Sequence, residues 1–139
     1  MKTSKPKANL NPPIRQRPKL VPISEEMRRW SALLESELLS WPGVITKPMF
    51  GFRGVYRGKR MFAALPRSRG FGSSSSILLK FRTMSPVLFQ RAESDNRLHS
   101  NSPGKGWFSF ALDSEADMRD ALWWLNHSYE SAAKGGNAR

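Results

Sequence analysis

Residues 55–65 have the sequence VYRGKRMFAAL. Apolar and β-branched residues stand on both sides of the pair Gly58-Lys59. Glycine at the first central position of a two-residue loop is typical of a type II′ turn, whose twist suits two antiparallel strands. The stretch therefore predicts a β-hairpin with strands at 55–57 and 60–65.

Three further segments have the character of strands. Residues 44–46 are β-branched, and the nearby Pro48 predicts an edge strand or a break. Residues 77–81 form an apolar run that is too short for a helix of ordinary length. Residues 107–112 alternate, which predicts one face with Phe108, Phe110 and Leu112 and an opposite face with Trp107, Ser109 and Ala111.

Helices are predicted on both sides of these strands. Apolar residues in 24–41 recur at spacings of three and four, and Ser24 is a suitable N-cap. A short helix is predicted for 86–92, where a serine and a proline stand at its start. The last helix is predicted to begin from a cap at Asp113 or Ser114, because acidic residues follow in the first turn.

The order of these elements indicates an α+β two-layer sandwich with a mainly antiparallel sheet of about five strands. The N- and C-terminal helices are predicted to pack on one face of the sheet. The glycine- and serine-rich residues 66–76 are interpreted as a flexible connection. Nothing in the sequence covers the opposite face, which is therefore a candidate surface for a partner or a second copy.

Charge and residue composition together divide the chain into three parts. Residues 1–22 carry six Lys/Arg, no acid and five of the ten prolines, which predicts a disordered basic arm. Residues 23–134 form the predicted domain, and 135–139, opening with Gly135-Gly136, form a flexible tail. Two interpretations of the arm stay open: a solvated tail, or a segment that contacts phosphate.

Several function classes are excluded or disfavoured. The chain has no cysteine and two histidines, so we expect no metal site and no cofactor. Gly58-Lys59 is no phosphate-binding loop, because Arg53 and Arg60 replace the required glycine and Ser/Thr. No catalytic spacing is recognisable, so we expect no enzymatic activity. No apolar run is long enough to cross a membrane, and the N-terminus lacks a signal-peptide core, so we expect a cytoplasmic protein.

Basic residues gather around the predicted hairpin and the following strand. Interleaved with them are aromatic residues such as Phe52, Tyr56 and Trp107, which could stack on bases while cations neutralise phosphates. The alternative is a solvated basic surface with buried rings. The candidate nucleic-acid-binding residues are Arg53, Arg57, Lys59, Arg60, Lys80, Arg82 and Lys105.

A set of residues around the predicted hairpin and the following strand carries a family resemblance: Met49, Phe50, Gly51, Gly54, Tyr56, Gly58, Phe62 and Lys80. Through them, residues 26–130 resemble the N-terminal domain of the TfoX/Sxy competence regulators, and more weakly the YjbR-like small domains. The late strand and the serine-rich insertion depart from the family pattern. The resemblance implies a compact α+β domain linked to the regulation of DNA-uptake genes, and it implies no catalytic residues.

Two functional hypotheses follow. The first is a non-catalytic binding or adaptor module of this type, which contacts a protein or another copy through the sheet face or the region of Trp123 and Trp124. The second is a non-specific nucleic-acid-binding protein that uses the basic arm and the hairpin patch, since no recognition helix is evident.

Overall fold

The computed structural model describes residues 20–71, 73–100 and 106–133. The described residues form eight short strands and three helices. In chain order they are β1 (Leu20–Pro22), α1 (Glu25–Leu38), β2 (Val44–Met49), β3 (Phe52–Arg57), β4 (Arg60–Pro66), β5 (Arg69–Phe71), β6 (Ser76–Lys80), α2 (Pro86–Ser94), β7 (Leu98–His99), β8 (Trp107–Ala111) and α3 (Asp117–Ser131).

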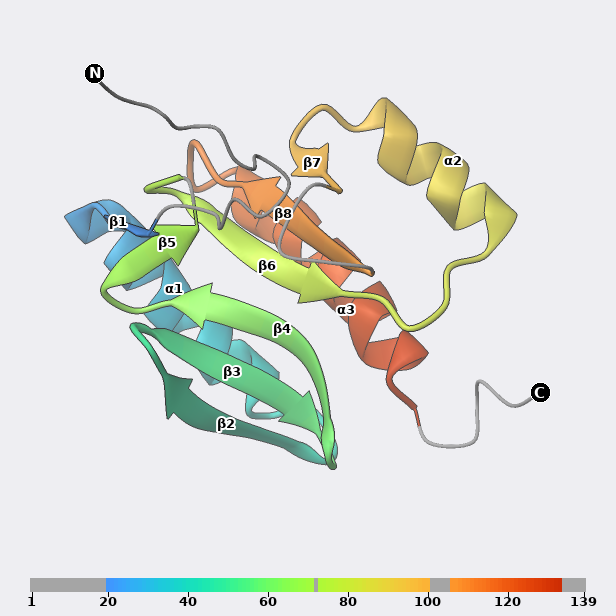
Figure 1. The fold of residues 1–139 in the computed structure, drawn as a ribbon, viewed down its shortest axis with the longest axis horizontal. Coiled ribbons are helices and arrows are strands. Elements are labelled where there is room, and N and C mark those ends of the chain that lie inside the picture. Colours follow the sequence, from blue (N-terminus) through green and yellow to red (C-terminus); the bar gives the residue numbers. More distant parts are fainter. Residues whose placement is uncertain (1–19, 72, 101–105, 134–139) are drawn as a thin grey trace, which may run out of the picture.

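The main sheet has six strands in the order β2-β3-β4-β6-β8-β7, and every neighbouring pair is antiparallel. Figure 1 shows α1 and α3 behind this sheet, while α2 lies beside its β7 edge. The predicted α+β class and the packing of both terminal helices on one face are thus confirmed.

The central hairpin forms as predicted. β3 and β4 pair directly around Gly58-Lys59, and Gly58 adopts a positive φ of 63° while Lys59 does not. β2 lies at the sheet edge, where Pro48 costs no ladder hydrogen bond to a further strand. The predicted edge position is therefore confirmed, although the strand continues through Pro48 to Met49.

The core lies between the sheet and the two long helices. Ser24 caps α1 by accepting a hydrogen bond from the backbone N–H of Met27, as predicted. The apolar stripes of both helices are buried against the inner face of the strands. The two adjacent tryptophans separate as the helical period requires: Trp124 is buried and Trp123 is 38% exposed. The main buried residues of the stripes are Met27, Trp30, Leu34 and Leu38 of α1 and Ala121, Leu125 and Tyr129 of α3.

The predicted caps of the last helix are wrong. The N-cap of α3 is Ala116, which makes no side-chain hydrogen bond. Instead the carboxylate of Asp117 accepts hydrogen bonds from the backbone N–H groups of Asp113 (2.8 Å) and Ser114 (3.1 Å). The side chain that binds the turn thus comes from inside the helix rather than from before it. α3 ends at Ser131 with Ala132 as its C-cap, and Gly135-Gly136, where the predicted flexible tail begins, lies outside the described residues.

Three short strands have no counterpart in the sequence prediction. β1 includes residues 20–22, which were assigned to the arm, and it pairs with β5 inside the predicted flexible connection. β7 is two residues long and pairs with β8. Two or three residues are too few to show a period, and these pairings depend on partners far along the chain.

Candidate functional site

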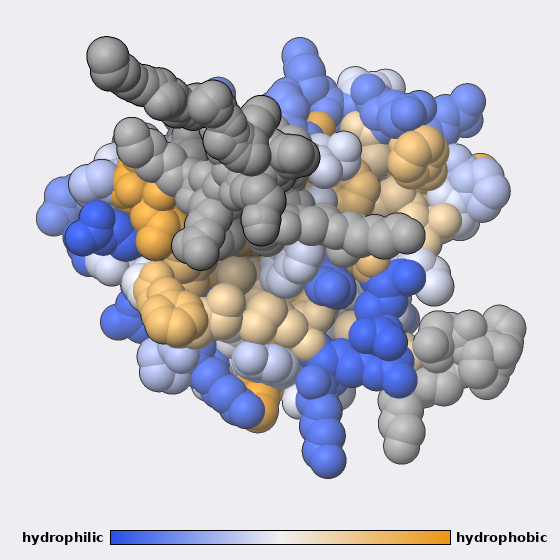
Figure 2. Space-filling view, viewed as in Figure 1, coloured by the Kyte–Doolittle hydropathy of each residue, from blue (hydrophilic) through white to orange (hydrophobic). Residues whose placement is uncertain are grey.

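One face of the main sheet has no helix on it. The register of the strands places alternate residues on this face, which we call the open face (Figure 1). Figure 2 looks onto it and shows apolar side chains over β3 and β4 with hydrophilic side chains around them. Its residues include Ile45, Lys47, Met49, Phe52, Gly54, Tyr56, Ala64, Leu78, Lys80 and Trp107.

The open face contains an apolar pocket of about 380 Å³. Phe52, Ala64 and Leu78 form its buried floor, a small apolar cluster separate from the main core. At its mouth, Leu20 of β1 is 43% exposed and Phe50 is 89% exposed. The complete lining is Leu20, Met49, Phe50, Phe52, Ala64, Leu78 and Trp107.

Phe50 occupies an unusual backbone position. It forms the two-residue turn between β2 and β3 with Gly51, and both residues have positive φ, 43° and 87°. Such type I′ turns favour Asn-Gly, since a bulky residue in the left-handed region is strained. The Gly51 carbonyl accepts backbone hydrogen bonds from Arg67 (2.8 Å) and Ser68 (3.0 Å), which hold the turn in place. A large ring is thus kept in solvent at a strained position, as happens at functional sites.

We expect Phe50→Asn to stabilise the protein by about 1 kcal/mol, because asparagine tolerates the left-handed conformation at lower cost. The ring of Phe50 loses little packing when removed, since it is almost fully exposed. Urea denaturation monitored by circular dichroism measures the change. A loss of stability would show that the ring packs in solution and that its position at the pocket mouth is structural.

Charges are segregated between the layers of the fold. None of the eight described strands contains an aspartate or a glutamate. All eleven acidic residues lie in the helices or in the segments beside them. The charged residues on the strands are therefore all cations: Lys47, Arg53, Arg57, Arg60 and Lys80 on the main sheet, and Arg69 on β5, which pairs only with β1.

Three arginines of the predicted nucleic-acid patch contact the helical layer. Arg53 forms an ion pair with Glu35 of α1 at 2.9 Å. The Arg57 guanidinium donates a hydrogen bond to the backbone carbonyl of Tyr129 at 3.1 Å, and Arg60 donates to that of Ala133 at 3.3 Å. Arg57 and Arg60, which stand on either side of the hairpin turn, therefore both bind the C-terminal end of α3, whose carbonyl groups attract cations.

The other candidate cations lie elsewhere. Lys59 and Arg82 are exposed, and Lys105 lies outside the described residues. On the open face the Lys80 ammonium is 5.5 Å from the centre of the Trp107 ring. Lys47 belongs to the basic cluster around the hairpin but was not among the candidate binding residues, and its ammonium group is 5.0 Å from the centre of the Tyr56 ring. The strand register reveals that pair, because Lys47 and Tyr56 fall on the same face of neighbouring strands.

The residues of the family resemblance lie at the pocket and its turn, on the rest of the open face, and in the hairpin turn or the core. Met49, Phe50 and Gly51 belong to the pocket and its turn. Gly54 lies on the open face, where an added Cβ would meet the side chains of Met49, Tyr56 and Met61 at 3.1–3.2 Å. Tyr56 and Lys80 also lie on the open face, whereas Gly58 is in the hairpin turn and Phe62 is in the core.

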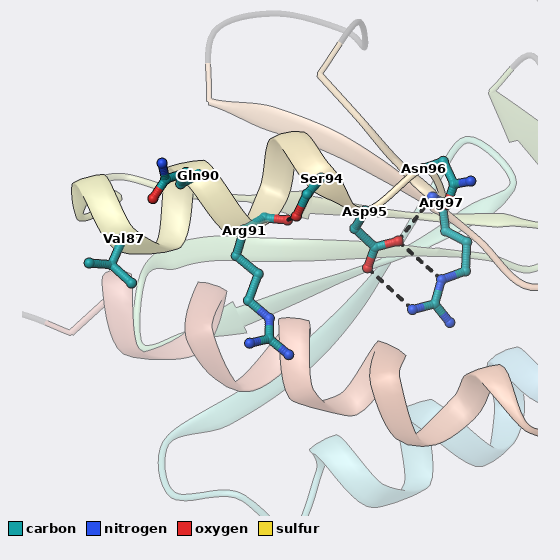
Figure 3. A pocket seen from close by; sticks show the side chains of 7 residues that line it. All are labelled: Val87, Gln90, Arg91, Ser94, Asp95, Asn96 and Arg97. Carbon is teal, nitrogen blue, oxygen red and sulfur yellow. Dashed lines mark hydrogen bonds and ion pairs between the residues drawn. The ribbon is translucent and has the colours of Figure 1, made fainter.

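A second, wider depression of about 770 Å³ lies along α2 (Figure 3). Its charged groups bind one another: Arg97 donates hydrogen bonds to Asp95, and also contacts Asp117 at 2.9 Å and Asp120 at 3.0 Å. Burial opposes ionisation of Asp95, yet the hydrogen bonds from Arg97 and Trp124 hold its pKa below the usual value. These contacts tie α2 to α3, so we interpret the cluster as structural.

The exposed Trp123 is already in contact with neighbours. The Arg91 guanidinium of α2 lies 4.6 Å from the centre of its indole ring, and the His127 ring centre lies at 4.3 Å. Trp124 donates a hydrogen bond to Asp95 at 3.2 Å. The tryptophan region therefore joins α2 to α3 and offers less free apolar surface than the open face.

Among the described residues, no group of histidine, aspartate and glutamate side chains could hold a metal ion. None of the described helices has both the length and the apolar character that crossing a membrane requires. No protein-family model, no curated protein and no solved structure matches this chain.

Proposed function

We propose that this protein is a non-catalytic binding module, and that its open face binds an anionic ligand that inserts a bulky apolar group into the pocket. The observation that carries the proposal is an apolar pocket set in a sheet whose strands bear only cations. The pocket volume of about 380 Å³ falls within the usual range of ligand sites, about 300–1,000 Å³.

The composition of the pocket supports binding rather than catalysis. None of its lining residues has a side chain that titrates, so the pocket itself offers no general acid, base or nucleophile. The resemblance of residues 26–130 to the TfoX/Sxy regulators supports a regulatory role for such a module.

A second copy of the chain is disfavoured as the ligand. A symmetric dimer through the open face would bring Lys47 and Lys80 of both copies together. No acidic side chain on the described strands would compensate this repulsion. The charge pattern therefore favours a partner that is itself negatively charged.

An anionic aromatic dye, anilinonaphthalene sulfonate, tests the proposal. We expect one dye molecule to bind the full-length native protein with a rise in fluorescence. Ala64→Leu, which fills the pocket floor, and Leu20→Asp, which places a negative charge at the mouth, each abolish that binding. Leu33→Asp is the matched control, since Leu33 is 50% exposed on α1, in the opposite layer.

Circular dichroism of each variant is the control that checks its folding. Two results would each overturn the proposed site. One is a native protein that does not bind the dye. The other is unchanged dye binding in both Ala64→Leu and Leu20→Asp.

A further inference from the structure

Resting on this proposed function, we infer that the anionic ligand is single-stranded nucleic acid, with one unpaired base inserted into the pocket of the open face. Each part of the inference comes from a separate observation: the aromatic rings, the lysines beside them, and the concave shape that an unpaired base can enter.

Aromatic rings surround the pocket. Phe50 stands at the mouth, Phe52 lies in the floor and Trp107 forms part of the wall. Tyr56 lies on the same face of β3, four residues along the strand from Phe52. Stacking on such rings is the main source of affinity for unpaired bases, and it is tolerant of sequence because every base has a π face.

Lysines accompany the rings. Lys80 lies beside Trp107 and Lys47 beside Tyr56, each ammonium within about 6 Å of a ring centre. A base stacked near either ring would bring its phosphate toward the neighbouring ammonium group. Because lysine side chains are flexible, they can leave the ring face and follow the phosphate. The two lysine–ring pairs therefore provide the alternation of stacking and charge neutralisation that a single strand needs.

The shape of the site favours a single strand over a duplex. Bases in a duplex are stacked and paired, so none can enter a pocket without first leaving the helix. The described helices offer no alternative, since all eleven acidic residues lie on them or beside them. An acidic peptide with a bulky side chain would satisfy the pocket, but it would leave the ring of Tyr56, away from the pocket, without a stacking partner.

Fluorescence anisotropy with the full-length chain tests the inference. The probes are a labelled single strand of about 12 nucleotides and the corresponding duplex, titrated from about 50 to 300 mM salt. We expect the single strand to bind about tenfold more tightly than the duplex, because only the single strand can stack a base on the rings.

Phe50→Asn separates stacking from folding, since we expect this variant to be more stable than the native protein. It should weaken single-strand binding about tenfold and leave the salt dependence unchanged, because it removes a ring and no charge. Phe89→Ala is the matched control: Phe89 is a half-exposed ring on α2 and should have no effect.

Lys80→Gln tests the phosphate contact. It should reduce the slope of log affinity against log salt by about 0.7, the contribution of one phosphate on a single strand. Arg29→Gln removes an exposed cation from α1, in the opposite layer, and should leave the slope unchanged. A full-length variant with glutamine at all six basic positions of residues 1–19 measures the contribution of the arm separately.

Three results would overturn the inference: no single-strand binding at low salt, equal binding of the duplex, or binding that depends on the arm cations and is unchanged in Phe50→Asn. A displacement experiment distinguishes the inference from the proposed function. If the dye binds and an acidic tryptophan-containing peptide displaces it while the oligonucleotide does not, the open-face site stands and its partner is a protein.

Discussion

Tyr129→Ala is expected to lower the free energy of unfolding by about 3–5 kcal/mol, the usual cost of removing a large buried aromatic ring. Tyr129 is 6% exposed near the C-terminal end of α3. Its ring makes edge contacts with Trp41, at 5.1 Å between centres, and with Phe62, at 5.4 Å. The substitution would therefore leave a cavity where α3, the end of α1 and the sheet meet.

Two polar contacts add to the role of Tyr129. Its hydroxyl donates a 2.7 Å hydrogen bond to the Pro42 carbonyl, and the Arg57 guanidinium lies 4.0 Å from its ring centre. Tyr129→Phe keeps the ring and loses only the hydroxyl, so we expect a cost of about 1 kcal/mol. Urea denaturation measures both variants. Equal costs for the two substitutions would contradict a role dominated by ring packing.

Arg97→Leu is the second substitution with a large expected effect, a loss of about 2–3 kcal/mol at neutral pH. Arg97 is held by three carboxylates, and two of them, Asp95 and Asp117, have side chains that are mostly buried. Removing the guanidinium leaves these two charges close together without their cation. Arg119→Leu removes an exposed arginine of α3 and is the matched control, with an expected change near zero.

Acid titration of the same variants gives a second readout. Hydrogen bonds from the backbone N–H of Asp113 and from Arg97 lower the pKa of Asp117. Hydrogen bonds from Arg97 and Trp124 likewise lower the pKa of Asp95. A carboxyl whose folded pKa is depressed contributes stability above its unfolded pKa of about 3.9 and loses it as the pH falls through the folded value. We expect the native protein to lose stability below about pH 4, and Arg97→Leu to lose less over that range. An equal loss of stability in the native protein and in Arg97→Leu would show that Arg97 does not lower the pKa values of these two carboxyl groups.

Local patterns in the sequence were sufficient for most of the architecture. The glycine at 58, the stripes of 24–41 and the alternation of 107–112 each reflect a period or a turn preference that is complete within a few residues. They predicted the hairpin, both long helices and the two alternating faces of the strand at 107–112. They also indicated an uncovered sheet face, because only two long amphipathic helices were available to cover a sheet with two faces.

Which residues come together in the candidate site on the open face was decided by the tertiary structure. The predicted hairpin put Arg57 and Arg60 on adjoining strands but could not show that they bind the end of α3, which lies some seventy residues later in the chain. The pocket likewise brings together β1, the turn at Phe50 and β8, whose pairings join distant segments. A local sequence pattern predicts which side of a helix or strand is apolar. Only the packing of all the elements decides which charged groups bind one another and which remain available to a ligand.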